Sequence, residues 1–179
     1  HKTVSSRTLN NFKIEKLASE AGKIAKDSVN PIQGKSGHYD LVIDPLPMAD
    51  LMGTVGASAS SYEVDSGMSF LQGKLGKYIG NFDLIDDGTL KGGMASSSFD
   101  SEGVPNKKTK IIDKGVLKTY LHNFSTSKKH NVRNTANAGL ISPVPTNLIL
   151  KGRKGKVFDV KKGIYVTNIW YTRFQNYVT

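Results

Sequence analysis

The chain has 179 residues, of which 25 are basic and 15 acidic, so that its formal net charge is +10. It has no apolar stretch near the roughly 20 residues of a membrane span, and without cysteine it can form neither disulfides nor cysteine-ligated zinc sites. We therefore expect one main unit in the cytoplasm, with a basic surface that could meet nucleic acid or another acidic partner.

Residues 11–29 predict an amphipathic helix. Asn11 could cap its start, and Pro31 lies just beyond its end. Its apolar positions recur at steps of three and four residues: Ile14, Leu17, Ala18, Ala21, Ile24 and Ala25.

A strand followed directly by a second helix is predicted after residue 37. Residues 38–44 are rich in β-branched and aromatic side chains, and Asp44-Pro45 is a typical helix start. Small residues near the end of this helix would let it approach a sheet closely.

The remaining chain predicts mainly strands. A strand in residues 82–90 enters an Asp-Gly turn, and a hairpin is expected around Asp113-Lys114-Gly115. The other expected elements are helical turns in 124–132, a strand in 146–152, a short helix in 157–163 and a strand in 163–178. This order indicates an α+β fold: an N-terminal amphipathic helix, then a strand-rich antiparallel sheet or barrel-like domain with a few helices.

Asp100 and Glu102 precede Gly103 in a turn, and two interpretations are open. On an extended backbone the two carboxylates would share a face and could act as acid and base. Alternatively, Asp100 accepts main-chain N–H bonds in an Asx-type turn and Glu102 pairs with a lysine, which is the commoner use of such residues.

The sequence contains no recognisable metal or nucleophile motif. None of its four histidines lies three to five residues from another, as a helical zinc pair would require: His1, His38, His122 and His130. Neither a Gly-x-Ser-x-Gly elbow nor a phosphate-binding Gly-rich loop is present. The lysine clusters have few aromatic residues between them, which favours a solvated surface over a single-strand nucleic-acid site.

The segment FDSEGVPNKKTKIIDKGVLKTYLHN resembles the hallmark of the TldD/PmbA family, also called modulators of DNA gyrase. YDLVIDPLPMADLM, LIDDGTLKGGMASSSFD and GIYVTNIWYTRFQNYVT are similar to the segments that flank it. The resemblance implies that 1–35 is the helical end of a preceding domain or a linker. It also implies that 36–179 is a family-type β-rich C-terminal domain, incomplete at its C-terminus.

Metal-binding members of this family carry His-Glu-x-x-x-His on the helix after the entry strand, and act as zinc-type peptidases. By spacing, that motif falls on MGTVGA, where Met52, Gly53 and Ala57 replace the ligands and the base. The resemblance therefore implies a metal-free PmbA/TldE-type chain, with no catalytic or metal residue of its own and no cofactor. A TldD-like partner subunit would supply the zinc.

The implied function is a role in a heterodimeric peptidase that takes unfolded peptides. A peptide could pair with a sheet edge near residues 108–122. The candidate peptide or interface residues are Asp100, Glu102, Gly103, Tyr120 and His122. Two alternatives stay open: a nucleic-acid or gyrase-associated regulator, and a standalone hydrolase that uses Asp100 and Glu102.

Overall fold

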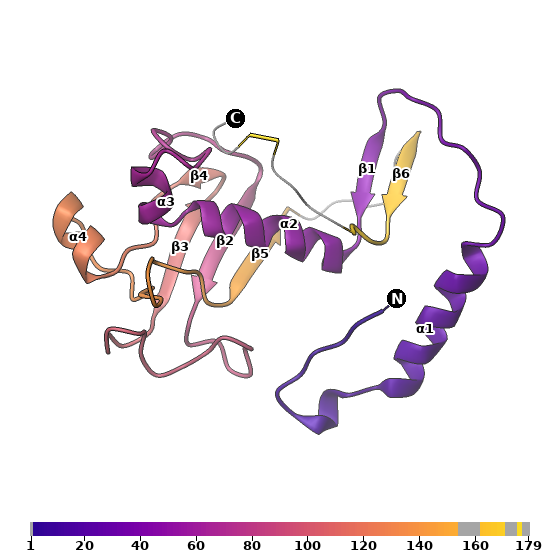
Figure 1. The fold of residues 1–179 in the computed structure, drawn as a ribbon, viewed down its shortest axis with the longest axis horizontal. Helices are drawn as coiled ribbons and strands as arrows, with labels where there is room; N and C mark the ends of the chain where they lie inside the picture. The colour runs from indigo at the N-terminus through magenta and orange to yellow at the C-terminus, as the bar shows by residue number, and fades with distance from the viewer. Residues whose placement is uncertain (1, 154–161, 171–174, 177–179) are drawn as a thin grey trace. The chain divides into compact units, whose positions relative to one another are not determined.

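The computed structural model describes residues 2–153, 162–170 and 175–176 (Figure 1). The chain divides into two units, His1–His38 and Tyr39–Thr179. The first unit contributes one long helix, and the second contains every strand of the described chain. The predicted α+β class, with a helix followed by a strand-rich part, is confirmed.

The first unit contains a short 3-10 turn, η1 (Leu9–Asn11), and helix α1 (Ile14–Asp27). The predicted amphipathic helix is confirmed, but it begins three residues later than expected. Lys13 occupies the N-cap position without a side-chain cap hydrogen bond, so the prediction of Asn11 as the cap was wrong. The 3-10 turn already uses residues 9–11, which leaves the α-helix to start after it.

In the second unit, β1 (Asp40–Ile43) pairs with β6 (Gly163–Val166). The two strands run parallel, from Asp40 opposite Gly163 to Ile43 opposite Val166. This small parallel sheet is a departure from the purely antiparallel arrangement that the sequence predicted. Of the predicted late strand 163–178, residues 163–166 form β6, residues 167–170 are not in a strand, and most of the rest lies outside the described residues. The predicted helix 157–163 also lies largely outside the described residues, although its last residue begins β6.

Helix α2 (Pro45–Ser58) begins where it was predicted, with Asp44 at the N-cap position and Pro45 at its first turn. The Asp44 carboxylate makes no cap hydrogen bond and instead accepts one from the hydroxyl of Tyr165. Near the other end of the helix, Gly56 lies directly against the side chain of Leu148, so that any larger residue would collide with it. The small residues of this helix therefore allow the close approach to a sheet that was expected.

The main sheet has four antiparallel strands in the order β4-β3-β2-β5. Their bounds are β2 (Phe82–Asp87), β3 (Lys108–Asp113), β4 (Val116–Leu117) and β5 (Leu148–Gly152). The predicted hairpin is confirmed: Lys114 and Gly115, between β3 and β4, have φ values of 50° and 83°. Within the described residues the sheet is open, because β4 and β5 pair with different neighbours and not with each other.

Two short helices complete the second unit. Helix α4 (Phe124–His130) confirms the predicted helical turns, and a capping box between Asn123 and Thr126 fixes its start. Helix α3 (Ser61–Asp65) was not predicted. It has only five residues, too few to show a helical period.

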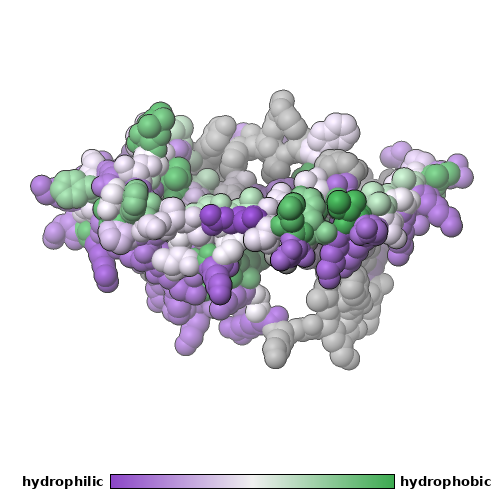
Figure 2. All heavy atoms as spheres, turned by 90° about the horizontal axis from the view of Figure 1, so that it is seen from below, coloured by the Kyte–Doolittle hydropathy of each residue, from purple (hydrophilic) through white to green (hydrophobic). Residues whose placement is uncertain are grey.

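The core lies between α2 and the four-stranded sheet. Its fully buried apolar side chains are Ala59, Leu71, Leu84, Ile111, Ile112, Leu117 and Leu121. On the face that Figure 2 shows, hydrophobic side chains occur in separate groups among hydrophilic ones. In the described part of the chain, no helix combines the length and the apolar character that crossing a membrane demands.

Candidate functional site: a corner and pocket around Asp100

Asp100 holds together a tight corner formed by residues 97–106. Its Oδ1 accepts hydrogen bonds from the main-chain N–H groups of Glu102 at 3.0 Å and Val104 at 2.9 Å. Its Oδ2 accepts a third from the N–H of Ala138 at 3.0 Å, which ties the corner to a loop far away in the sequence. The Asx-type turn considered for Asp100 is therefore present, and the carboxylate is occupied by main-chain donors.

The side chain of Glu102 contacts the start of helix α4. Its Oε2 accepts a hydrogen bond from the N–H of Phe124, the first residue of that helix, at 2.8 Å. The expected pairing of Glu102 with a lysine was wrong. A carboxylate at a helix N-terminus satisfies one of the N–H groups that have no partner within the helix, and the helix dipole favours its charge.

The corner borders a pocket of about 350 Å³. Asn137 lies in its wall, is 2% exposed, and donates from Nδ2 to Asp86 and to the carbonyl of Val144. Its Oδ1 is buried and has no partner among the described residues, and the same holds for Oδ1 of Asn106, also in the wall. Two residues of the pocket wall thus each keep one buried acceptor oxygen without a donor among the described residues.

The buried carboxylate of Asp86 accepts hydrogen bonds from two residues that line this pocket, Asn137 and Thr146. Asp86, at the end of β2, is 2% exposed and accepts hydrogen bonds from Asn137 Nδ2 at 2.6 Å. It also accepts from the N–H and the hydroxyl of Thr146, at 2.6 and 2.8 Å. Burial raises the pKa of Asp86, although these hydrogen bonds work in the opposite direction.

Its neighbour Asp87 has the opposite electrostatic environment. The hydroxyl and N–H of Thr89 donate to Asp87 Oδ1, and Lys108 forms an ion pair with its Oδ2 at 3.1 Å. The hydrogen bond from the Thr89 side chain, and then the lysine, lower the pKa of Asp87. Both carboxylates at the predicted Asp-Gly turn thus have side-chain partners: Thr89 and Lys108 bind Asp87, and Asn137 and Thr146 bind Asp86.

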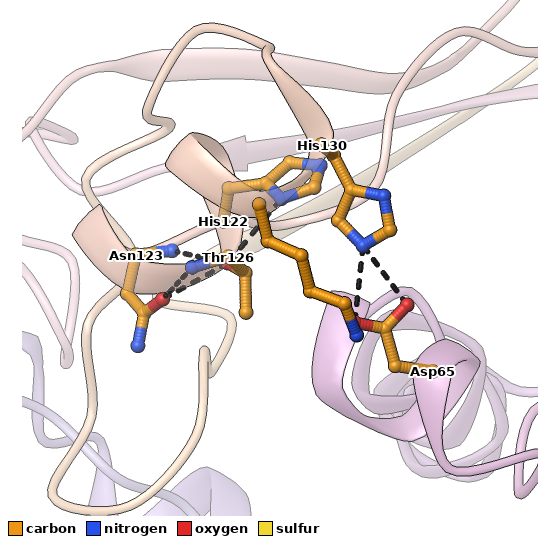
Figure 3. A network of polar contacts seen from close by, with 6 residues as sticks. Asp65, His122, Asn123, Thr126 and His130 are labelled. Carbon is orange, nitrogen blue, oxygen red and sulfur yellow. Dashed lines mark hydrogen bonds and ion pairs between the residues drawn. The ribbon is translucent and has the colours of Figure 1, made fainter.

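His122 lies in a group of polar side chains from α4, the residues just before it, and Asp65 of α3 (Figure 3). The side chain is 3% exposed, and its Nδ1 lies 3.3 Å from the hydroxyl of Thr126. The ring centroids of His122 and His130 are 5.8 Å apart, and His130 Nε2 lies 2.9 Å from an oxygen of Asp65. Burial opposes the ionised form of Asp65, but hydrogen bonds with Lys129 and His130 lower its pKa overall.

The remaining predicted residues lie apart from the pocket wall. Gly103 takes a φ of 78° in the corner, a conformation that glycine adopts without strain. Tyr120 donates its hydroxyl to the carbonyl of Leu71 at 2.8 Å and packs against the core. The structure thus brings Asp100, Glu102 and Gly103 together in one corner, whereas Tyr120 and His122 have structural contacts of their own. Sequence reasoning missed Asp86, Asn106 and Asn137.

Met52, Gly53 and Ala57 lie on helix α2, where the family resemblance places the metal motif. A thioether, a hydrogen and a methyl group offer neither the imidazole nor the carboxylate that zinc prefers, so these residues do not fit the metal. Among residues 2–153, 162–170 and 175–176, no group of three or more histidine, aspartate or glutamate side chains is placed to hold a metal ion.

Acidification should destabilise the fold through His122. Burial, and next the neighbouring His130, lower the pKa of the folded His122 ring, while an unfolded histidine takes up its proton near pH 6.5. Between the two pKa values the unfolded state binds more protons, so the free energy of unfolding falls as the pH falls below about 6.5 and levels off below the lowered pKa.

Urea unfolding of wild type and His122→Gln between about pH 7.5 and pH 5 measures this contribution. We expect the variant to lose part of the acid sensitivity. His38→Gln, which makes the same substitution at an exposed histidine, is the matched control. An identical pH profile in wild type and His122→Gln would contradict the assignment.

Comparison with known proteins is consistent with this architecture. The family model described as the PmbA/TldA metallopeptidase C-terminal domain matches residues 36–179. An uncharacterised protein of Methanocaldococcus jannaschii is 33% identical over 97% of this chain and 44% of its own length. A metalloprotease of the same organism is 30% identical over 83% of this chain and 39% of its own length.

A solved structure from Thermotoga maritima, described as a modulator of a DNA gyrase, superposes with a TM-score of 0.77. It is 32% identical, and the match covers 81% of this chain and 34% of that one. The chain thus spans roughly two fifths of the length of the curated relatives it matches.

Proposed function

This chain belongs to the PmbA/TldA metallopeptidase C-terminal domain family, and from that membership we propose that it is a metal-free subunit of a cytoplasmic metallopeptidase complex. In this complex a TldD-like partner supplies the zinc, and both subunits contact unfolded peptides. The proposal rests on the residue set of α2: Met52, Gly53 and Ala57 lie on this helix, and the spacing of the family resemblance puts them at the positions of two histidines and a glutamate. A chain with these residues needs a second subunit for hydrolysis.

Peptide binding is supported by the outer edge of β3. Along Lys108–Ile112 this strand pairs with β2, whereas β4 pairs only with Ile112 and Asp113. On the side away from β2, residues 108–110 therefore have no neighbouring strand in the described part of the chain. An extended peptide can add to such an edge through main-chain hydrogen bonds, which tolerates many peptide sequences.

A partner interface is supported by the loop that Asp100 holds at Ala138. Leu140 and Ile141, at the tip of this loop, are 97% and 81% exposed. A bridge between Ala138 and Pro143 closes the base of the loop, so that the two apolar side chains are presented to the outside. Adjacent apolar side chains displayed in this way are typical of a surface that another chain covers.

The proposal is tested by measuring zinc content and peptidase activity of the full-length protein, alone and mixed with its metal-binding homologue from the same cell. We expect neither zinc nor activity in the protein alone, and zinc-dependent activity in the mixture. The matched control is a mixture in which the homologue has lost its own motif glutamate, which should be inactive. Zinc-dependent hydrolysis by the protein alone would refute the proposal.

A further inference from the structure

A basic pocket lies beside the open edge of β3. Its volume is about 430 Å³, and Lys107, Lys108, Lys110 and Arg133 contribute to its wall together with the polar side chain of Thr109. The wall contains no aromatic and no acidic side chain. We define this site, by its four cationic residues, as the basic pocket.

Two of the four cations already have carboxylate partners. Lys108 pairs with Asp87 at 3.1 Å, and Lys110 pairs with Asp113 at 2.8 Å. Each of these two ammonium groups thus has a carboxylate beside it. The two lysines therefore add little net attraction for a ligand.

Lys107 and Arg133 are different. The ammonium group of Lys107 is partly buried and donates a hydrogen bond to the carbonyl oxygen of Asn134, at 2.5 Å. Arg133 is exposed, and within the described residues neither side chain has a carboxylate at ion-pair distance. Burial, and next the proximity of Arg133, lower the pKa of Lys107. The charge of Asp100 works in the opposite direction, as the smallest of the three effects on this pKa. The two cations thus share one pocket without a carboxylate at ion-pair distance, an arrangement that an incoming anion would relieve.

We propose that the basic pocket binds the carboxylates of an acidic peptide segment lying along β3. The inference rests on the proposed function in that it names the class of peptide the subunit would select. A planar guanidinium beside an ammonium matches one or two carboxylates, and Thr109 adds a hydroxyl. A nucleic acid is disfavoured, because the pocket has no aromatic ring on which a base could stack.

The test measures fluorescence anisotropy of labelled peptides with the full-length protein. The probes are an unstructured glutamate-rich peptide, the same peptide with glutamine in place of glutamate, and a single-stranded oligothymidylate. We expect the glutamate peptide to bind in preference to the other two probes, with an affinity that falls as salt is added. Arg133→Glu should weaken this binding by about tenfold or more, since a charge-assisted hydrogen bond is lost and a repulsive charge gained.

Lys91→Glu is the matched control, because it makes the same change of charge at an exposed lysine outside the pocket. It should leave the affinity for the glutamate peptide within about twofold, as expected for an exposed charge that does not line the pocket and is screened by salt. Lys107→Met supplies a second variant that removes a cation without adding an anion, and it too should weaken binding.

Equal loss of binding in Arg133→Glu and Lys91→Glu would overturn the proposal, since it would reflect overall charge only. Tighter binding of the oligothymidylate, lost in Arg133→Glu, would also overturn it and assign the pocket to nucleic acid. The measurement needs no partner and no zinc. Selective binding of the glutamate peptide would therefore support the pocket assignment even if the mixed subunits hydrolysed nothing.

Discussion

Replacement of Asp86 by alanine is expected to lower the free energy of unfolding by about 3 kcal/mol, because three donors in a buried site lose their acceptor at once. These donors are Nδ2 of Asn137 and the N–H and hydroxyl of Thr146. The carboxylate connects the end of β2 to two separate parts of the 134–147 segment. Its loss should therefore loosen the wall of the pocket as well as the sheet.

Chemical denaturation monitored by circular dichroism measures the effect, with Asp50→Ala as the matched control. Asp50 is an exposed aspartate on α2, and its replacement should change the stability by no more than about 0.5 kcal/mol. The stability of Asp86→Asn should lie between those of Asp86→Ala and Asp50→Ala. The amide keeps one acceptor oxygen, but its NH2 group meets the donors of Asn137 and Thr146. A stability of Asp86→Ala within the range of the control would contradict the role assigned to this network.

The dependence on pH separates the charge of Asp86 from its hydrogen bonds. Its folded pKa is raised, so between 3.8 and that raised value the folded state binds more protons than the unfolded state. Through this group alone, stability increases as the pH falls through the folded pKa. The gap between wild type and Asp86→Ala should then widen on acidification, opposite in sign to the contribution of His122.

Elements with a strong local signal could be predicted from the sequence. The hairpin follows from one glycine at a position that needs positive φ, and the start of α4 is fixed by a capping box between Asn123 and Thr126, which are only three residues apart. The pairing of β1 with β6 could not be predicted, because its register depends on two segments near opposite ends of the chain. A strand's sequence indicates that it is extended, but not which distant strand it meets.

In the candidate site, too, features set by neighbouring residues could be predicted, whereas features set by distant segments could not. The Asx-type role of Asp100 follows from its position before Gly103, since the turn is local. The acceptor that Glu102 offers to Phe124 depends on where the tertiary fold places the start of α4, which no spacing rule predicts. Asp86 and Asn137 were missed for the same reason: they are far apart in the sequence, and each is unremarkable until the fold brings them to 2.6 Å.

Asp100→Ala is expected to destabilise the protein by about 2 to 3 kcal/mol and to impair assembly with the proposed metal-binding partner, whereas Glu102→Gln should preserve both stability and assembly. Alanine leaves the N–H groups of Glu102, Val104 and Ala138 without their acceptor. Glutamine keeps an oxygen for the N–H of Phe124 and loses only the charge at the start of α4. Denaturation, size-exclusion chromatography of the mixed subunits and peptidase assays measure the three consequences.

The glutamine variant discriminates between a corner and a catalytic acid pair, because an amide can accept a hydrogen bond but cannot transfer the proton of a general acid. If the two carboxylates only build the corner, the double variant Asp100→Asn/Glu102→Gln should lose peptidase activity in the same proportion as it loses assembly. Intact assembly with abolished turnover would instead assign catalysis to this chain. Three main-chain donors on Asp100 and a helix N-terminus on Glu102 leave both carboxylates already engaged, which is why we expect assembly to fail first.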